Sequence, residues 1–368
     1  MKIGILTYHR AHNYGALLQA YALKRYIESL GHNVEFIDYW PDYHKNLFRI
    51  FPNFSKSNPL RWLKSLMKFS ISIRRTLKRR KGYLNFIKHE LSLQRKPKYK
   101  NKISLNNVIY DAIIYGSDQI WREQKNAQFK GFDDVYFGEH IICNKKISYA
   151  ASMGITSIDP GSLNKLKNLL GNFKHISVRE NKLQEIIAQN AGIKPELVLD
   201  PVFLLEPYSW LKLLPEKRII KEKYIFFYQL HLSEEATNFV EVLKEKTNLS
   251  VIEIQGRINP FKFGKRYRYQ TANPFDFLRL IRDAEIVVST SFHGIAFSIL
   301  FNKNFYALGM GANSDRANTL LQHAGLEERM INNQDEFELY KSRKLKINNT
   351  FNHIVEHSKL FLNNAIND

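Results

Sequence analysis

Residues Glu285 to Phe301 read EIVVSTSFHGIAFSILF, and this stretch decides the fold class. Ile286 to Val288 form a short β-branched apolar run, which is typical of a buried parallel strand. Small polar residues follow, and Ile295 to Leu300 then carry apolar side chains at helical spacing. Open α/β sheets bind their ligands where a strand enters a helix through a tight polar turn. The stretch therefore predicts an α/β protein with a ligand site in this turn.

The turn contains Ser291, His293 and Gly294. A glycine lets a ligand approach the backbone closely, and the start of a helix offers free amide donors to an anion. Histidine can transfer protons near neutral pH. Two interpretations of His293 remain open from the residues alone: it is a catalytic group, or it caps the helix or packs in the core.

The chain has 368 residues, enough for two domains, and its 44% hydrophobic and 24% charged residues are typical of a globular protein. Cys143 is the single cysteine, which excludes a disulfide within the chain, and we interpret it as a packing residue. The first residues become polar too early for a signal peptide, and no apolar run is long enough to span a bilayer. We expect a cytoplasmic protein.

The formal net charge of +20 indicates an anionic partner. Between Lys56 and Lys102 the only acidic residue is Glu90, and Asn58 to Leu93 alternate Lys and Arg with Trp, Phe and Leu. This pattern fits an amphipathic helix on an anionic membrane surface, and it equally fits a core helix with a solvated charged face. No nucleic-acid-binding motif accompanies the charge, so we expect no nucleic-acid partner.

Two α/β runs follow one another along the chain. The order strand, turn, helix, strand from Lys2 to Tyr39 resembles a nucleotide-binding half-domain, although the G-x-G-x-x-G pattern of dinucleotide sites is absent. A second run begins after a Pro-containing segment at Val202 to Lys223. We predict an N-terminal domain at 1–205 with a basic helical insertion at 56–102, a C-terminal domain at 206–350, and a final helix at 351–368 that packs back on the first domain.

Several short motifs together resemble the polysaccharide pyruvyl transferase family. Each motif is weak alone, but their order and spacing along the chain are specific. They are Asn13-Tyr14-Gly15-Ala16-Leu17-Leu18-Gln19-Ala20, Gly116-Ser117-Asp118-Gln119-Ile120-Trp121, Tyr149-Ala150-Ala151-Ser152-Met153-Gly154, Ser177-Val178-Arg179-Glu180, Leu199-Asp200-Pro201-Val202, Ser291-Phe292-His293-Gly294, and Arg316 before Leu320-Leu321.

The resemblance implies two Rossmann-like domains facing a cleft, as in the GT-B arrangement of glycosyltransferases. It also implies transfer of a pyruvyl group from phosphoenolpyruvate to a sugar, commonly as a cyclic ketal on two hydroxyls. The sugar is often carried on a lipid diphosphate at the cytoplasmic membrane face. By position in the shared motifs, the resemblance implies that His293 is an active-site histidine and that Arg179 binds the donor. Some members have Arg at or beside the position two before the histidine, where this chain has Ser291 and Phe292; Arg316 could supply that charge.

A site for phosphoenolpyruvate needs cations and amide donors, and arginine suits both its phosphate and its carboxylate. We therefore place Arg179, Arg316, Ser291 and Gly294 at the donor. For Arg179 the alternative is a surface side chain paired with Glu180 or with another acid. Arg316 lies at a helix start, where the helix dipole disfavours a cation, which favours a ligand role over a solvated side chain.

Asp118 is a second candidate acid or base, and the alternative is an N-cap for a helix beginning at Gln119. Trp121 could stack on a sugar or be buried. We expect Trp121 to line the acceptor side of the cleft together with Asn13, Tyr14, Gly15 and Ser117.

No metal-ligand spacing is present, and we expect no cofactor besides phosphoenolpyruvate as co-substrate. Two alternatives of other classes stay open: a GT-B-like glycosyltransferase using a nucleotide-sugar, and a non-catalytic module that binds anionic surfaces. A nucleotide-dependent synthetase is disfavoured because the G-x-x-x-x-G-K pattern is absent.

Overall fold

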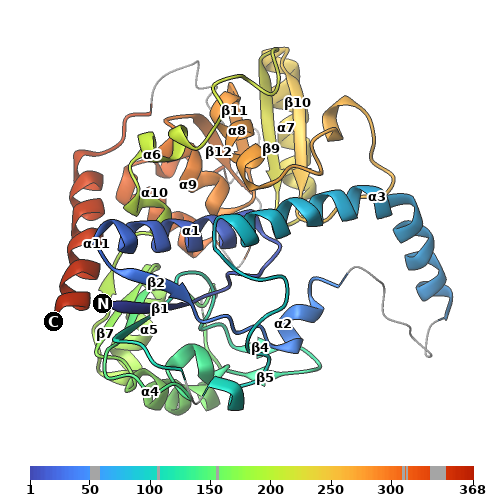
Figure 1. The fold of residues 1–368 in the computed structure, drawn as a ribbon. Helices are drawn as coiled ribbons and strands as arrows, with labels where there is room; N and C mark the ends of the chain where they lie inside the picture. Colours follow the sequence, from blue (N-terminus) through green and yellow to red (C-terminus); the bar gives the residue numbers. More distant parts are fainter. Residues whose placement is uncertain (50–58, 106–107, 155–156, 309–310, 312–313, 332–344) are drawn as a thin grey trace.

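A computed structural model of the chain describes residues 1–49, 59–105, 108–154, 157–308, 311, 314–331 and 345–368 (Figure 1). Residues 56–58 of the predicted basic insertion, including the predicted helix start at Asn58, lie outside this part of the chain. The described chain contains two parallel sheets with helices packed around them.

The first sheet has the strand order β2-β1-β3-β6-β7-β8, and neighbouring strands are parallel. In that order the strands are β2 (Asn33–Phe36), β1 (Lys2–Leu6), β3 (Ala112–Tyr115), β6 (Lys146–Ala151), β7 (His175–Val178) and β8 (Glu196–Leu197). The second sheet is also parallel and has the order β10-β9-β11-β12. Its strands are β10 (Ser250–Gln255), β9 (Tyr224–Gln229), β11 (Ile286–Ser289) and β12 (Asn304–Ala307).

The central strands β3 and β11 are buried along their whole length, as expected for apolar strands covered by helices on both faces. The first sheet is accompanied by α1 (Tyr14–Ser29), α4 (Leu163–Leu170) and α5 (Asn181–Ala191). The second is accompanied by α7 (Glu234–Thr247), α8 (Pro274–Asp283), α9 (Phe292–Leu300) and α10 (Asp315–Ala324). Shorter elements are α2 (Asp42–Asn46), α6 (Pro207–Lys212), the pair β4 (Gln124–Lys125) and β5 (Lys130–Gly131), and the 3₁₀ turn η4 (Pro201–Leu204).

Helix α1 lies between the two sheets (Figure 1) and contacts α8, α9 and η4. The ring of Tyr14 stacks on that of Phe277 with centroids 4.6 Å apart, and its hydroxyl donates to the carbonyl of Ala272 at 2.8 Å. Tyr14 therefore fixes the start of α1 against the C-terminal half. The prediction of two Rossmann-like halves facing each other in a GT-B arrangement is confirmed.

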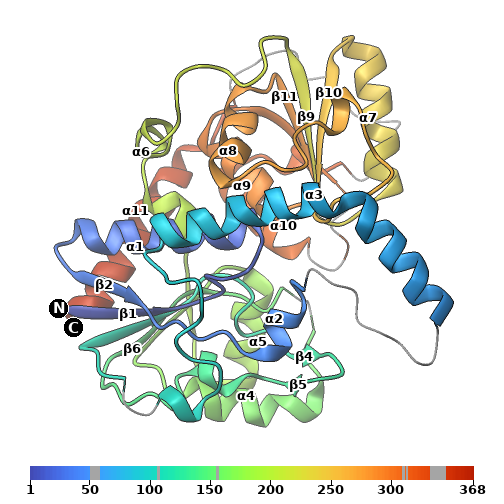
Figure 2. The same ribbon diagram turned by 45° about the vertical axis from the view of Figure 1, so that its right-hand side comes forward.

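The final helix α11 (Asn349–Asn367) lies against the first sheet's half of the molecule (Figure 2). Lys145 donates to the carbonyl of Ile366 at 2.7 Å, and the amide of Leu199 donates to Ser358 Oγ at 2.9 Å. The last helix thus packs against the N-terminal half, beside the start of β6 and the end of β8.

Helix α3 (Pro59–His89) is the long helix of the basic segment. Its C-terminal part packs on the body of the molecule, where Tyr83, Phe86 and Ile87 are buried. Its N-terminal part extends beyond the body in both views (Figures 1 and 2). The core-helix interpretation therefore holds for the end of α3, whereas several large side chains at its start are exposed.

Candidate active site

A cavity of about 1100 Å³ lies between the two halves and the inner face of α3. Its lining is strongly cationic, and among the described residues that line it, Asp118 supplies the only carboxylate. A cleft that is lined by charges of one sign and has walls of low dielectric constant raises the local concentration of ligands with the opposite charge. The basic side chains that line it are Arg49, Lys68, Arg79, Arg80, Arg122, Arg257 and Arg316.

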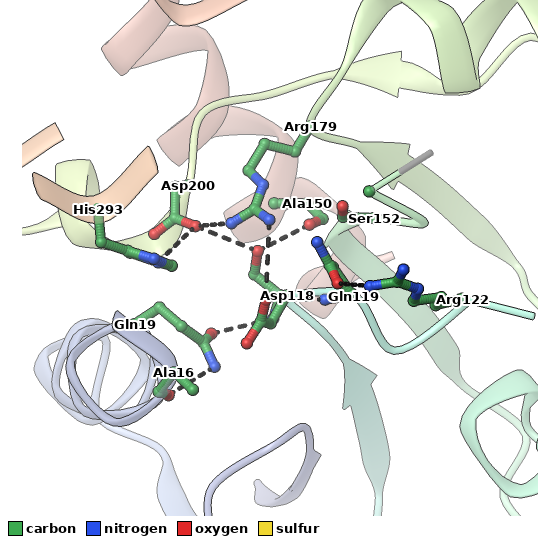
Figure 3. A network of polar contacts seen from close by, with 12 residues as sticks. Ala16, Gln19, Asp118, Gln119, Arg122, Ala150, Ser152, Arg179, Asp200 and His293 are labelled. Atoms are coloured by element: carbon green, nitrogen blue, oxygen red, sulfur yellow. Dashed lines mark hydrogen bonds and ion pairs between the residues drawn. The ribbon is translucent and has the colours of Figure 1, made fainter. Parts of the chain in front are cut away.

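Asp200 is the centre of a buried polar cluster beside this cavity (Figure 3). It follows β8, and its Oδ1 accepts the amide of Val202 at 3.1 Å, which begins η4. Its Oδ2 accepts a hydrogen bond from Arg179 Nη1 and faces His293 Nε2 at 3.5 Å. Burial alone would raise the pKa of Asp200, but His293 and Arg179 hold that pKa well below its usual range. Asp200 is therefore a fixed negative charge behind the imidazole.

His293 lies in the first turn of α9 and borders the cavity, with 6% of the residue exposed. On one side its Nε2 faces Asp200 at ion-pair distance but without hydrogen-bond alignment. On the other side it touches Gly15, where an added Cβ would lie 2.0 Å from His293 Nδ1. Alanine would be favoured over glycine inside a helix. Glycine at position 15 therefore makes room for the imidazole, and His293 is held by elements of both halves.

Arg179 follows β7 and is 3% exposed. It pairs with Asp200, so the pairing with an acid in the alternative interpretation is found, whereas its surface position is wrong because Arg179 is buried. Glu180 points the other way and accepts from Ser152 Oγ at 2.8 Å and from the amide of Met153 at 3.1 Å. Nε and Nη2 of Arg179 are buried without a hydrogen-bond partner among the described residues.

Arg316 lies near the start of α10 and is 8% exposed, so the alternative of a solvated side chain is wrong. Its Nε is buried and has no hydrogen-bond partner in the described chain. The guanidinium carbons of Arg179 and Arg316 lie 4.5 and 5.8 Å from the ring centroid of Phe292. Burial, and then the charge of Arg179, lower the pKa of Arg316 to about 10.

Two buried guanidinium groups therefore lie against one aromatic ring, each with a donor that has no partner among the described residues. Buried donors normally have partners, and leaving a charged one unpaired costs free energy. An anion bound between Arg179 and Arg316 would satisfy these donors and relieve the repulsion between the two cations.

Asp118 lies across the cluster from Asp200, with Oδ1 3.9 Å from Arg179 Nη2 (Figure 3). No helix begins at Gln119, so the N-cap alternative is wrong; Asp118 instead adopts a left-handed backbone conformation with φ of 73°. Aspartate tolerates this conformation better than most residues. Its carboxylate borders the cavity, and its backbone carbonyl accepts the amide of Ser152 at 3.1 Å, which fixes the turn.

Trp121 does not line the cleft, which corrects the prediction that it is an acceptor residue. It is fully buried, its ring stacks on Phe137 at 5.2 Å between centroids, and its Nε1 donates to the carbonyl of Tyr136 at 3.0 Å. The turn after Asp118 directs this side chain into the hydrophobic core beside the first sheet. There the indole packs against apolar neighbours and its N–H finds a hydrogen-bond acceptor.

The remaining predicted residues divide between the cavity wall and the layer behind it. Asn13 and Ser291 border the cavity, and Asn13 also caps α1 by accepting the amide of Ala16 at 3.3 Å. Tyr14 and Ser117 are fully buried and do not border it. Gly294 faces protein rather than ligand, because an added Cβ would lie 2.1 Å from Ser289 Oγ. Tyr14, Ser117 and Gly294 therefore support the site without lining the cavity.

Sequence reasoning missed several residues of the site. Asp200 was visible only as one member of a motif at a strand end, yet it joins Arg179 to His293. His12 and His231 also border the cavity, each in the segment after a strand. Strand-end position was the available signal for all three. In the described residues no group of three or more His, Cys, Asp or Glu side chains could hold a metal ion.

The fold and the site together define a two-domain α/β protein with a cationic, histidine-containing cavity between its halves. The chain belongs to the polysaccharide pyruvyl transferase family, whose model matches residues 13–311, and the predicted resemblance is confirmed. It is accordingly a transferase by family. A comparison with curated proteins gives no match.

Several solved structures align over nearly the whole chain. The Escherichia coli heptosyltransferase WaaC with ADP is 13% identical, with a TM-score of 0.35, 99% of this chain covered and 100% of that one. The UDP-GlcNAc 2-epimerase of Methanocaldococcus jannaschii is 13% identical, with a TM-score of 0.48 and the same coverage of both chains. The UDP-N-acetylglucosamine 2-epimerase of Rickettsia bellii is 11% identical, with a TM-score of 0.45, 100% of this chain covered and 96% of that one. The two parallel sheets with their surrounding helices define the α/β fold of this chain.

Proposed function

We propose that the protein transfers the pyruvyl group of phosphoenolpyruvate to a sugar and forms a pyruvate ketal in cell-surface polysaccharide biosynthesis. One observation carries the proposal: Arg179 and Arg316 both lie against the ring of Phe292, next to His293, and each has a buried donor without a partner in the described chain. A small ligand with two anionic groups suits two guanidinium groups, each of which can hold a phosphate or carboxylate through two donors.

In the proposed reaction a proton is added to the methylene carbon of the enol, which leaves a cation at the central carbon. A sugar hydroxyl attacks that carbon and loses its proton, the carbon–oxygen bond to phosphate breaks, and a second hydroxyl closes the ketal. His293 is assigned to proton transfer, with the Asp200 carboxylate 3.5 Å from its Nε2. Asp118, which borders the same cavity, is assigned as the second acid or base.

The acceptor is proposed to be a sugar carried on a lipid diphosphate, so the protein would act at the inner face of the cytoplasmic membrane. Support comes from the cavity, whose cations continue from Arg316 to Arg79 and Arg80 on α3, beyond what one small donor would occupy. No metal and no further cofactor enter the proposed reaction.

The test is incubation with phosphoenolpyruvate and a panel of free and lipid-linked sugars, followed by phosphate release and the added pyruvyl mass. We expect His293→Ala to abolish transfer with an unchanged circular dichroism spectrum and melting temperature. His353→Ala is the matched control, because His353 is exposed on α11, and it should keep full activity. A folded, active His293→Ala protein would remove the histidine from the mechanism.

A nucleotide-sugar-dependent glycosyltransferase is the second candidate, and the volume of about 1100 Å³ leaves room for such a donor. Thermal-shift titrations separate the two. Stabilisation by phosphoenolpyruvate that is lost in Arg316→Gln supports the first proposal, and stabilisation by a nucleotide-sugar alone supports the second. If neither ligand binds and no acceptor releases phosphate, a non-catalytic binding module is the remaining interpretation.

A further inference from the structure

The start of α3 has two different faces. Its inner face borders the cavity with Ser65, Lys68, Phe69, Ser72 and Thr76. Its outer face carries large apolar side chains at spacings of three, four and four residues, which a helix places in one stripe. These side chains are Leu60, Leu63, Met67 and Ile71, and they are 72%, 59%, 54% and 43% exposed.

Exposed cations continue this outer face toward the end of the helix. Arg74, Lys78 and Lys81 are exposed, and helical spacing puts them in line with Met67 and Ile71. Arg79 and Arg80, by contrast, border the cavity. The basic run at 78–81 is therefore divided, with two charges facing outward and two facing the cavity.

A loop of the C-terminal half extends the apolar area. Arg75 donates to the carbonyls of Pro260 and Lys262 at 2.8 and 2.9 Å, and its guanidinium carbon lies 4.4 Å from the ring centroid of Phe263. This fixes the loop beside the helix, one turn along from Ile71. Phe261 and Phe263 are 56% and 61% exposed.

We propose that this outer surface docks the protein on an anionic lipid bilayer. The docking surface consists of Leu60, Leu63, Met67, Ile71, Arg74, Lys78, Lys81, Phe261 and Phe263. Exposed apolar side chains lined up with cations are the features by which helices lie in a membrane interface. No helix in the described part of the chain is long and apolar enough to cross a bilayer, so the contact is peripheral.

A second copy of the chain is a poorer occupant of this surface. A symmetric pair formed through this surface would bury Arg74, Lys78 and Lys81 of both copies at the interface, and no exposed acid on the same stretch of helix compensates them. An anionic bilayer complements both the apolar and the charged part of the surface.

Docking would also orient the cavity. Because the opposite face of the same helix lines the cavity, a docked α3 brings the cavity close to the bilayer surface. The diphosphate of a lipid-linked sugar would then meet Arg79 and Arg80 while its hydrocarbon chain stays in the membrane. This last step rests on the proposed function; docking itself does not.

The test is co-sedimentation of the full chain with vesicles of phosphatidylcholine alone and with 30–40% phosphatidylglycerol, as a range of roughly physiological surface charge. We expect binding to the anionic vesicles only, weakened by salt. Each outward cation contributes about fivefold to the partition coefficient. Arg74→Gln/Lys78→Gln/Lys81→Gln should therefore reduce binding at least tenfold, and so should Leu63→Glu/Met67→Glu.

Two control variants separate docking from general charge and from misfolding. Lys212→Gln/Lys217→Gln/Lys221→Gln removes the same charge from exposed positions elsewhere, and Ile142→Glu changes an apolar side chain that is 81% exposed. Both should bind vesicles as the unchanged protein does. Equal binding by all variants, or a dimer in light scattering that Leu63→Glu/Met67→Glu dissolves while vesicle binding is absent, would overturn the proposal. Neither readout uses substrate, so failure here is distinct from failure of the pyruvyl transfer assay.

Discussion

Gly15 on α1 and His293 on α9 approach so closely that a Cβ at position 15 would lie 2.0 Å from the imidazole Nδ1. The two residues come from different halves of the molecule and are far apart in the sequence. The position of the proposed catalytic imidazole therefore depends on the seating of α1 between the two sheets, which Tyr14 fixes through its stack on Phe277.

Gly15→Ala should reduce activity far more than stability. The substitution favours the helix by up to about 1 kcal/mol, but the methyl group must displace His293 from its place opposite Asp200. We expect kcat to fall at least a hundredfold and the melting temperature to fall modestly, because adding a methyl group to a well-packed site costs about 1–3 kcal/mol. Gly161→Ala is the control, because a Cβ there meets only Asp159 at 3.4 Å, an ordinary contact. Normal kcat in Gly15→Ala would show that the imidazole need not stay where it is.

Asp200→Asn should lower kcat more than it changes the KM for phosphoenolpyruvate. The amide keeps the shape of the side chain but loses the charge that faces His293 and Arg179. The substitution should also destabilise the protein, because the buried Arg179 loses its charged partner. Rates are therefore measured on protein that is folded by circular dichroism. An unchanged kcat of the folded protein would assign Asp200 to structure alone.

Arg316→Gln should weaken donor binding without destabilising the fold. In the described chain Arg316 has no partner for its buried Nε, and the charge of Arg179 repels it, so its removal relieves that repulsion in the free protein. We expect an unchanged or higher melting temperature and at least a tenfold higher KM for phosphoenolpyruvate. Arg268→Gln, at an exposed position, controls for the loss of one positive charge. A lower melting temperature with normal KM would contradict the assignment of Arg316 to the donor.

The loop that leads into α1 is held by Asp38, and this predicts a specific loss of stability in acid. Asp38 Oδ2 accepts from Arg10 Nη2 at 2.7 Å and from the amide of Lys98 at 3.0 Å, and Oδ1 pairs with Arg10 Nε and lies 3.2 Å from His9 Nε2. Burial alone would raise the pKa of Asp38, but the hydrogen bonds from Arg10 and His9 hold it well below its ordinary value.

Because the folded-state pKa of Asp38 is lowered, its stabilising contribution is complete above the unfolded-state pKa of about 3.9 and is lost as the pH falls through the folded value. Asp38→Asn should therefore be less stable than the unchanged protein at pH 7, by roughly 3 kcal/mol, and the gap should narrow below about pH 4. Urea unfolding at pH 7, 5 and 3 measures this. A gap that stays constant across these pH values would exclude the ionised carboxylate as its cause.

Much of the fold followed from local patterns, and the parts that failed depended on distant contacts. The strand that begins at Ile286, the helix that ends at Leu300 and the strand-turn-helix-strand order from Lys2 to Tyr39 were recognisable because apolar spacing is a local signal. Trp121 was placed wrongly because nothing local shows that its turn folds beneath the first sheet. Asp200 was overlooked as a site residue because its partners, Arg179 and His293, are brought to it only by the packing of the two halves.

The boundary between the halves is filled by a single hydrophobic core. One cluster of buried side chains runs from Ile3 and Tyr14 through Trp210 to Phe277, Phe297 and Leu362, so it includes residues of both sheets and of the last helix. Unfolding of either half would therefore expose part of the other half's hydrophobic core to water. Calorimetry of this 368-residue chain should accordingly show one heat-absorption peak, and scission of the chain between the sheets should leave two fragments that are each insoluble when alone.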